Sequence, residues 1–343
     1  MNTIHYLLKS GFFALTEYLS GHVLTCLVPA FFIAGAIGVF VSQASIIKYF
    51  GAQAKKFLSY SVASVSGSVL TVCSCTVLPL FAGIYQRGAG LGPATTFLFS
   101  GPAINILAII YSARLLGIDL GIARALGAVA FSIILGLIMS LLYLREERER
   151  ENIYIPSSQT VEGEKRTVIL LVYFLVLVGI LVFAASKYFF TTLILLIFLI
   201  FILYRFFKPQ EIKDWMMSTW DFVKLITPWL LVGVFIAGIL KAILPKEIIN
   251  TWLGGNSLRA NLIASAFGAL MYFATLTEVP IVKALMQLGM GKGPALALLL
   301  AGPSLSLPNM LVIRGIMGTK KTAVYIILVI ILSTIAGLIF GMI

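Results

Sequence analysis

Charged residues are scarce in this sequence. Only 11% of its 343 residues are Asp, Glu, Lys or Arg, whereas about a quarter of a soluble domain is usually charged. Because so few charges cannot cover a water-exposed surface, most of the surface is expected to face lipid. The 25 Lys and Arg residues outnumber the 13 Asp and Glu residues, but they stand singly between apolar runs. That spacing is typical of interfacial anchors and topology signals, and it argues against a nucleic-acid partner.

Cysteine and histidine are also rare, which excludes several kinds of site. Three cysteines cannot form a disulfide framework, and Cys73 and Cys75 are too close in sequence for an unstrained mutual bond. His5 and His22 form no haem-ligand or quinone-ligand pattern. A Walker A motif is absent from the sequence, so we expect no ATP hydrolysis by that route. The sequence therefore predicts no cofactor and no enzymatic activity.

Long apolar runs dominate what is present. A membrane-spanning helix needs about 20 apolar residues, and eight runs have this character. They are residues 24–42, 95–113, 121–144, 168–186, 189–207, 225–244, 295–313 and 322–343. Two longer segments, 57–86 and 258–287, are interrupted by small or polar residues followed by Pro79 or Pro280. Each predicts a broken helix or a re-entrant hairpin, so we expect an all-α integral membrane protein with about 8–10 spans.

The two halves of the chain are related by an internal repeat. At an offset of 201 residues, glycines and prolines align without a gap from Pro79 to Gly117. The aligned positions include Pro79 with Pro280, Gly88 with Gly289, Gly101-Pro102 with Gly302-Pro303, and Gly117 with Gly318. If both long segments are hairpins, basic residues gather on the side that holds residues 145–166, and the two repeats are inverted.

The apolar runs, the polar stretch and the repeat together divide the chain into five predicted regions. Residues 1–20 are expected to form an amphipathic helix on the membrane surface. Residues 21–144 form the first transmembrane repeat, and residues 145–166 form a polar loop. Residues 167–207 supply two connecting transmembrane helices, and residues 208–343 form the second repeat.

The motif Thr-Val-Cys-Ser-Cys-Thr-Val-Leu-Pro ends at Pro79, inside a membrane segment. Irregular backbone at this depth survives only where protein buries it or where it lines a cavity. The thiols of Cys73 and Cys75 would offer soft sulfur ligands to a thiophilic ion or metalloid, with Cys26 as a candidate third ligand. The alternative is that these cysteines are small apolar residues that pack tightly between helices.

A second motif breaks a membrane helix in each half. A Gly-Pro step frees backbone carbonyls and exposes the start of a half-helix, whose positive dipole end can face a polar or anionic substrate. The alternative is a kink that only serves packing. The candidate substrate-binding residues of this motif are Gly101, Pro102 and Asn105, together with Gly302, Pro303, Ser304 and Asn309.

Glu278 is a carboxylate well inside an apolar stretch. An intramembrane acid is costly and is by default a functional hypothesis, so we interpret Glu278 as a candidate proton carrier. The alternatives are a salt bridge to Lys283 or a position at the membrane surface. In the repeat alignment Glu278 falls opposite Val77, two residues after Cys75, so the halves present a carboxylate and thiols near equivalent places.

These motifs together resemble the predicted-permease family that includes the ArsP-type organoarsenical efflux permeases. The resemblance rests on the run around Cys73 and Cys75, on residues 88–94 and 101–105, and on residues 277–280 and 302–304. It implies a permease of the prokaryotic cytoplasmic membrane without an ATPase domain. It also implies that Cys73 and Cys75 bind trivalent organoarsenicals.

We therefore expect a secondary permease that exports a thiophilic small solute, such as a trivalent organoarsenical, with proton coupling through Glu278. Its expected partners are membrane lipid and a small-molecule or metalloid substrate, and no oligomeric state is predicted. One alternative is a permease for another soft metal or sulfur compound. Two others are a thiol-dependent intramembrane redox protein and a membrane subunit that anchors soluble partners through residues 145–166.

Overall fold

The fold is helical throughout the part of the chain that the computed structural model describes. The described residues are 2–20, 27–41, 55–70, 74–153, 164–186, 188–243, 252–271 and 278–343. Within these ranges no β-sheet forms, and an isolated antiparallel bridge joins Gly254 to Met290. The expectation of an all-α protein is confirmed.

Helices follow one another with short connections. The first half contains α1 (Asn2–Tyr18), α2 (Val28–Phe40), α4 (Lys56–Leu70), α5 (Ser74–Gln86), α6 (Leu91–Ala103), α7 (Ile106–Leu116) and α8 (Ile118–Leu142). The connecting helices are α9 (Leu144–Ile153), α10 (Glu164–Ala185), α11 (Phe189–Phe206) and α12 (Pro209–Ile243). The second half contains α14 (Leu258–Leu270), α15 (Glu278–Gln287), α16 (Lys292–Ser304), α17 (Leu307–Met317) and α18 (Thr319–Met342).

The membrane-spanning capacity lies in long apolar helices and in two bent pairs. Among the described residues, 4 helices are long and apolar enough to cross a membrane, namely α8, α11, α12 and α18. The count is up to 6 if the pairs α6–α7 and α16–α17 are each one span. The expected spans 95–113 and 295–313 are therefore not straight helices. Four shorter apolar helices, in α2, α5, α10 and α14, account for the higher expectation of 8–10 spans.

The internal repeat extends to the ends of the helices. α6 and α16 begin 201 residues apart, at Leu91 and Lys292, and α7 and α17 begin and end at the same spacing. The turns before α8 and α18 are also equivalent, because Gly117 and Gly318 have φ angles of 117° and 84°. This backbone conformation strongly favours glycine over residues with a side chain. The two halves therefore share local geometry as well as sequence.

Both long interrupted segments return to the place where they start. In the second half, the bridge between Gly254 and Met290 and a bond from the Gly291 amide to the Leu253 carbonyl (3.1 Å) join the residues that precede α14 to those that follow α15. In the first half, the hydroxyl of Tyr60, near the start of α4, lies where a Cβ on Gly92, near the start of α6, would be placed. The residues at or just beyond the two ends of each segment therefore lie close together, as the expected hairpin requires.

The two repeats run in opposite directions, as contacts at the two ends of α8 demonstrate. The start of α16 lies beside the start of α8, where Lys292 pairs with Asp119 at 2.6 Å. The start of α6 lies beyond the other end of α8, where the Leu91 amide donates to Glu147 at 2.9 Å. α6 and α16 therefore start at opposite ends of one spanning helix, and the inverted arrangement is confirmed.

The centre of the molecule is formed by the half-helices α6 and α16. Every residue of α6 is buried, and so is every residue of α16 after Lys292. α8 packs on α6 where Gly136 meets Gly92, and α18 packs on α16 where Gly337 meets Gly293. A Cβ on Gly136 or Gly337 would lie 2.6 Å from the facing glycine carbonyl. Small residues at these crossings let the backbones approach closely.

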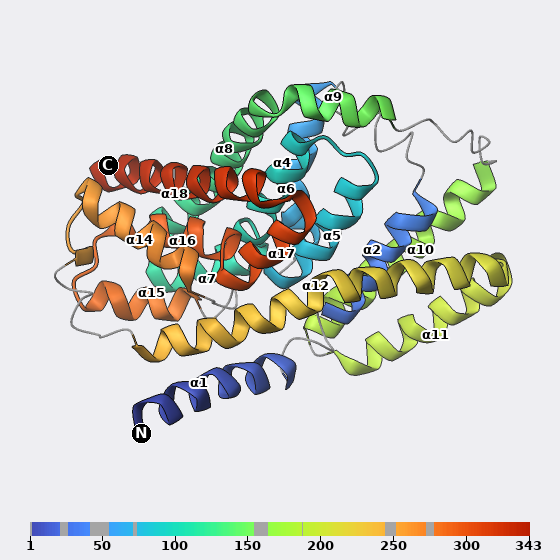
Figure 1. The fold of residues 1–343 in the computed structure, drawn as a ribbon, viewed down its shortest axis with the longest axis horizontal. Coiled ribbons are helices and arrows are strands. Elements are labelled where there is room, and N and C mark those ends of the chain that lie inside the picture. The colour runs from blue at the N-terminus through green and yellow to red at the C-terminus, as the bar shows by residue number, and fades with distance from the viewer. Residues whose placement is uncertain are drawn as a thin grey trace.

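Outside this centre, α12 runs past both groups of helices. In Figure 1, α14 and α15 lie toward one end of the molecule and α10 and α11 toward the other. α1 runs alongside the apolar C-terminal part of α12, where Phe12 contacts Phe235 and the Ser10 hydroxyl donates to the Gly238 carbonyl. The amphipathic segment 1–20 is thus largely helical, and its place on the membrane surface stays a prediction.

The expected polar loop over residues 145–166 needs a correction. Its first part is helix α9, which ends at Ile153, and its last residues belong to α10, which starts at Glu164. The physical reason is that Glu and Arg both have high intrinsic helix propensity. Glu147 also anchors α9 to the protein through the Leu91 amide, so this segment is partly docked rather than a solvated connection.

Candidate functional site

The break in each bent pair comes directly after a Gly-Pro step. α6 and α7 meet at an angle of 45°, and α16 and α17 meet at 48°. Pro102 and Pro303 lie in the last turn of the first half-helix of each pair, where proline disfavours continuation of the helix. Asn105 then caps α7 by accepting from the Leu107 amide at 3.0 Å. Ser306 caps α17 by accepting from the Asn309 amide at 3.4 Å.

The carbonyl at the end of each first half-helix receives a side chain from the following spanning helix. Arg124 of α8 donates from Nε to the Ala103 carbonyl at 3.1 Å. Tyr325 of α18 lies with its hydroxyl 3.5 Å from the Ser304 carbonyl. Ala103 and Ser304 are equivalent in the repeat, and so are Arg124 and Tyr325. The terminal carbonyl of the first half-helix is thus contacted by a cationic side chain in the first half of the chain and by a phenol in the second.

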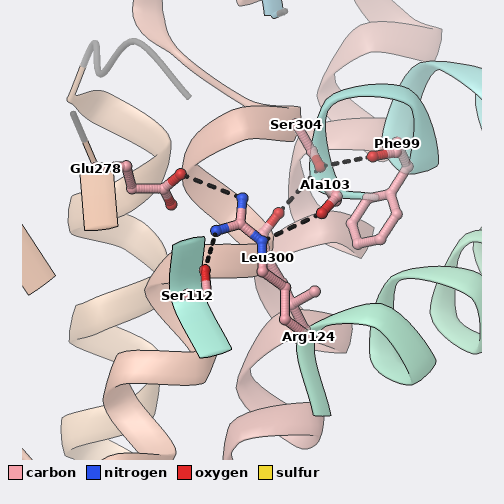
Figure 2. Close-up of polar contacts among 7 residues, drawn as sticks. All are labelled: Phe99, Ala103, Ser112, Arg124, Glu278, Leu300 and Ser304. Atoms are coloured by element: carbon pink, nitrogen blue, oxygen red, sulfur yellow. Dashed lines mark hydrogen bonds and ion pairs between the residues drawn. The ribbon is translucent and has the colours of Figure 1, made fainter. Parts of the chain in front are cut away.

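Arg124 and Glu278 form an ion pair between the two repeats. The guanidinium Nη2 is 3.5 Å from Glu278 Oε2, and the two side chains are 0% and 1% exposed. Nη1 donates to the Ser112 hydroxyl of α7 at 3.0 Å. Figure 2 shows Arg124 between Glu278, Ser112 and Ala103, so all three nitrogens of the guanidinium have an acceptor. A buried charge is tolerated when it is paired and hydrogen-bonded in this way.

The second oxygen of Glu278 points toward the other Gly-Pro break. A Cβ built on Gly302 would lie 3.2 Å from Glu278 Oε1. This oxygen is buried and accepts no hydrogen bond from any residue in the described ranges. An unpartnered carboxylate oxygen is a costly feature of a protein interior. The carboxylate therefore has the capacity to take up a proton or to accept from another donor.

Close to this pair, the broken helices of the two repeats touch. The Ser304 hydroxyl lies 2.9 Å from the carbonyls of Phe99 in α6 and of Leu300 in its own helix. Figure 2 places Ser304 and Phe99 on the same side of Arg124 as Ala103. The ends of the two half-helices and the ion pair therefore lie near one another inside an apolar core.

Arg124 was not singled out from the sequence, although a signal was present. It is an arginine within the apolar run 121–144, and an ionisable residue inside a membrane segment is a functional candidate by the same rule that applies to Glu278. The interpretation of the Lys and Arg residues as interfacial anchors includes Arg124 among them. The partner of Glu278 is thus Arg124, and the salt bridge to Lys283 considered from the sequence is not the contact observed.

Some of the remaining predicted residues lie outside the described part of the chain, and the others lie in α5 and α17. Cys26 and Cys73 lie outside the described residues. Cys75 belongs to α5, but only the backbone of this residue is described. Pro79 lies in the same helix and is buried. Asn309 is 1% exposed, and its Oδ1 atom accepts no hydrogen bond from the described part of the chain. α5 packs against α17, which carries Asn309, as α15 packs against α7 in the inverted arrangement.

Comparison with known proteins identifies a family and two relatives. Residues 9–342 match the family ArsP_1, which is described as "Predicted permease". The chain is 48% identical to the UPF0718 protein MJ0584 of Methanocaldococcus jannaschii, over 100% of this chain and 97% of that protein. It is 24% identical to the UPF0718 protein YraQ of Escherichia coli, over 71% of this chain and 56% of that protein. No solved structure is significantly similar to it.

The family match covers nearly the whole chain, including both bent helix pairs and the residues of the buried ion pair. Apolar helices long enough to cross a membrane are present in both halves. The chain therefore belongs to the predicted permease family and is a multi-pass membrane transporter rather than an enzyme.

Proposed function

We propose that this permease is a secondary exporter of a thiophilic small solute, such as a trivalent organoarsenical, in the cytoplasmic membrane. The observation that carries the proposal is the pair of inverted broken helices that meet at the buried Arg124–Glu278 pair. Inverted repeats with discontinuous helices place substrate sites near the middle of the membrane. The substrate pathway then runs between the two repeats, past Gly101, Gly302 and Ser304.

The choice of a soft substrate rests on the Cys-Ser-Cys run. Trivalent methylarsenic has one bond to carbon and two positions open to sulfur, and two thiols match that valence. Cys75 lies in α5, two residues before the repeat equivalent of Glu278, and Glu278 begins α15, so one thiol of the run and the carboxylate occupy related elements. In this proposal Cys73 and Cys75 hold the substrate, and Asn105 and Asn309 contribute polar contacts.

Proton coupling is assigned to Glu278. Arginine keeps its charge in proteins, so the Arg124–Glu278 pair changes only when the carboxylate is protonated. A proton on Glu278 removes the attraction across the repeats and allows them to part. Loss of that proton to the other side restores the pair. The cycle requires no nucleotide and no cofactor.

The test is uptake into proteoliposomes that contain the purified chain. Methylarsenite, arsenite, Zn²⁺ and thiosulfate are compared side by side, because another soft metal or sulfur compound is the alternative cargo. We expect methylarsenite to accumulate, and we expect Cys73→Ser and Cys75→Ser each to lose most of this flux, because a hydroxyl is a harder ligand. Cys26→Ser should matter only for a site with three sulfurs.

The same variants measure binding directly. Thiolate is the form that binds soft ions, so methylarsenite binding to the wild type should release protons and strengthen with rising pH. Each variant is first checked for monodispersity in detergent. Full binding by the Cys73→Ser, Cys75→Ser double variant would exclude the thiols as ligands. Transport of Zn²⁺ or thiosulfate without methylarsenite would instead redirect the substrate class while leaving the permease pathway in place.

A further inference from the structure

Two ion-pair contacts join the repeats at opposite ends of the spanning helix α8. Asp119, in the first turn of α8, pairs with Lys292 at the start of α16 at 2.6 Å. Beyond the other end of α8, Lys321 of α18 lies 3.1 Å from Glu146 and 3.5 Å from Glu147. α8 has 25 residues and is therefore about 37 Å long, more than the roughly 30 Å of a hydrocarbon core. The two contacts thus lie near opposite membrane faces.

These contacts occupy equivalent places in the inverted repeat. Each joins the start of a buried half-helix to the first turn of the spanning helix of the other repeat. At one face the elements are α16 and α8, joined directly by Lys292 and Asp119. At the other face they are α6 and α18, joined through Glu147, which accepts from the Leu91 amide and contacts Lys321.

The two contacts differ in how tightly they are closed. Lys292 and Asp119 are 61% and 47% exposed, so the ion pair that joins α16 to α8 at that face is solvated. Lys321 and Glu147 are 14% and 6% exposed, and the Lys321 ammonium lies 5.4 Å from the centre of the Tyr143 ring. The Tyr85 hydroxyl also approaches Glu147, at 3.4 Å. The second contact is therefore the more buried closure.

We propose that these two contacts are the alternating gates of the permease. In an inverted repeat, the halves exchange conformations during transport, so equivalent contacts at opposite faces are made and broken in turn. Opening the Lys292–Asp119 gate exposes the Arg124–Glu278 region to one side of the membrane. Opening the gate formed by Lys321, Glu146 and Glu147 exposes it to the other. The inference rests on the permease function and is independent of which solute is carried.

The test measures accessibility, so it does not depend on knowing the substrate. Cys26, Cys73 and Cys75 are replaced by serine, and Ser304→Cys supplies one reporter thiol where the half-helices touch. A membrane-impermeant maleimide is then applied to sealed right-side-out vesicles or to inverted vesicles. Lys292→Met should raise labelling from the face of Asp119 by up to about fivefold, the scale set by loss of an exposed ion pair. Lys321→Met should raise labelling from the opposite face.

Matched controls separate gating from general loosening. Lys224 pairs with Asp221 at 2.9 Å within α12 and is 59% exposed, so Lys224→Met removes a similar charge without touching the repeat interface. Its labelling should equal that of the parent. The exchange Asp119→Lys with Lys292→Asp should return labelling to the parent level. Glu146→Gln, which removes an exposed partner of Lys321, tests the second gate if Lys321→Met does not fold.

Two results would overturn the proposal. One is an increase from the same face for Lys292→Met and for Lys321→Met or Glu146→Gln. The other is unchanged labelling in folded variants of both gates. If the two gate variants increase labelling from opposite faces but methylarsenite is not taken up, the proposed substrate is rejected and the gate proposal is supported.

Discussion

At the scale of single residues, Arg124 and Glu278 depend on each other. Each is buried in an apolar environment, and each would be an uncompensated charge without the other. Removing one partner of a buried pair typically costs about 3–5 kcal/mol, whereas replacing both by apolar groups is often close to neutral. The stability of the site is therefore a property of the pair, although 154 positions separate its members in the sequence.

This dependence predicts a non-additive mutant cycle. Arg124→Met should lower the free energy of unfolding by about 3–5 kcal/mol, and Arg124→Met with Glu278→Leu should recover most of the loss. The measurement is thermal or denaturant unfolding of purified protein in one detergent. Lys224→Met, at the exposed pair with Asp221, is the matched control and should change stability by less than about 1 kcal/mol. Additive effects at Arg124 and Glu278 would argue against the ion pair.

Proton coupling makes a separate prediction for Glu278. An imposed pH gradient should accelerate methylarsenite transport by the wild type, because protonation of the carboxylate frees Arg124. Glu278→Gln mimics the protonated state and should remove that acceleration. Glu211→Gln is the control, because Glu211 contacts Arg166 near the start of α12, away from the repeat interface. If the Glu278→Gln variant keeps both the rate and the pH response of the wild type, the proton must travel by another group.

At the scale of elements, the broken helices concentrate function in a few turns. The first half-helix of each pair is buried, and it ends where its carbonyl meets Arg124 or Tyr325. A straight helix would offer no free carbonyl and no half-helix start at this depth. The Gly-Pro step thus determines where polar groups become available inside the apolar core.

A leucine at either break should abolish transport. Gly101→Leu places a side chain inside the fully buried α6, and Gly302→Leu drives one toward Glu278 Oε1, which a Cβ alone would approach to 3.2 Å. Flux should fall to the level of empty liposomes while the protein still inserts and purifies. Gly315→Leu is the control, because a Cβ there meets Trp229 at an ordinary 3.7 Å. Normal flux in the Gly101 or Gly302 variant would instead support the alternative that the Gly-Pro motif only serves helix packing.

How much of this architecture the sequence predicts depends on the range of the interaction. Glycines and prolines act locally, so the breaks near Pro102 and Pro303 and the repeat follow from their positions in the chain, whereas the distribution of Lys and Arg is what favours hairpins over broken helices. The partner of Glu278 does not, because nothing local selects Arg124 over Lys283. The helical start of the expected loop was missed for the opposite reason. Its charge suggested solvation, whereas the Leu91 amide and Lys321 give Glu147 partners in the fold.

At the scale of the whole molecule, the hairpins and the inversion fix which segments share a membrane face. The starts of α4 and α6 lie together, beyond the end of α8, and α9 follows on that side. The starts of α14 and α16 lie together at the start of α8. Residues 145–166 contain five Lys and Arg residues, and Lys and Arg beside membrane helices favour the cytoplasmic side whatever Asp and Glu accompany them, so the first of these faces is predicted to be cytoplasmic.

A labelling experiment tests this assignment at four positions. In a cysteine-free background, cysteines at Lys56 and Arg87 should react with an impermeant maleimide only in inverted vesicles, because both flank the first hairpin. Cysteines at Arg259 and Lys292, which flank the second hairpin, should react only in right-side-out vesicles. If Lys56 and Arg87 were labelled from opposite faces, the first segment would cross the membrane and the number of crossings between the repeats would become even. The inversion requires an odd number of crossings. An even number would therefore be incompatible with the contacts of Lys292 with Asp119 and of Lys321 with Glu147 at opposite ends of α8.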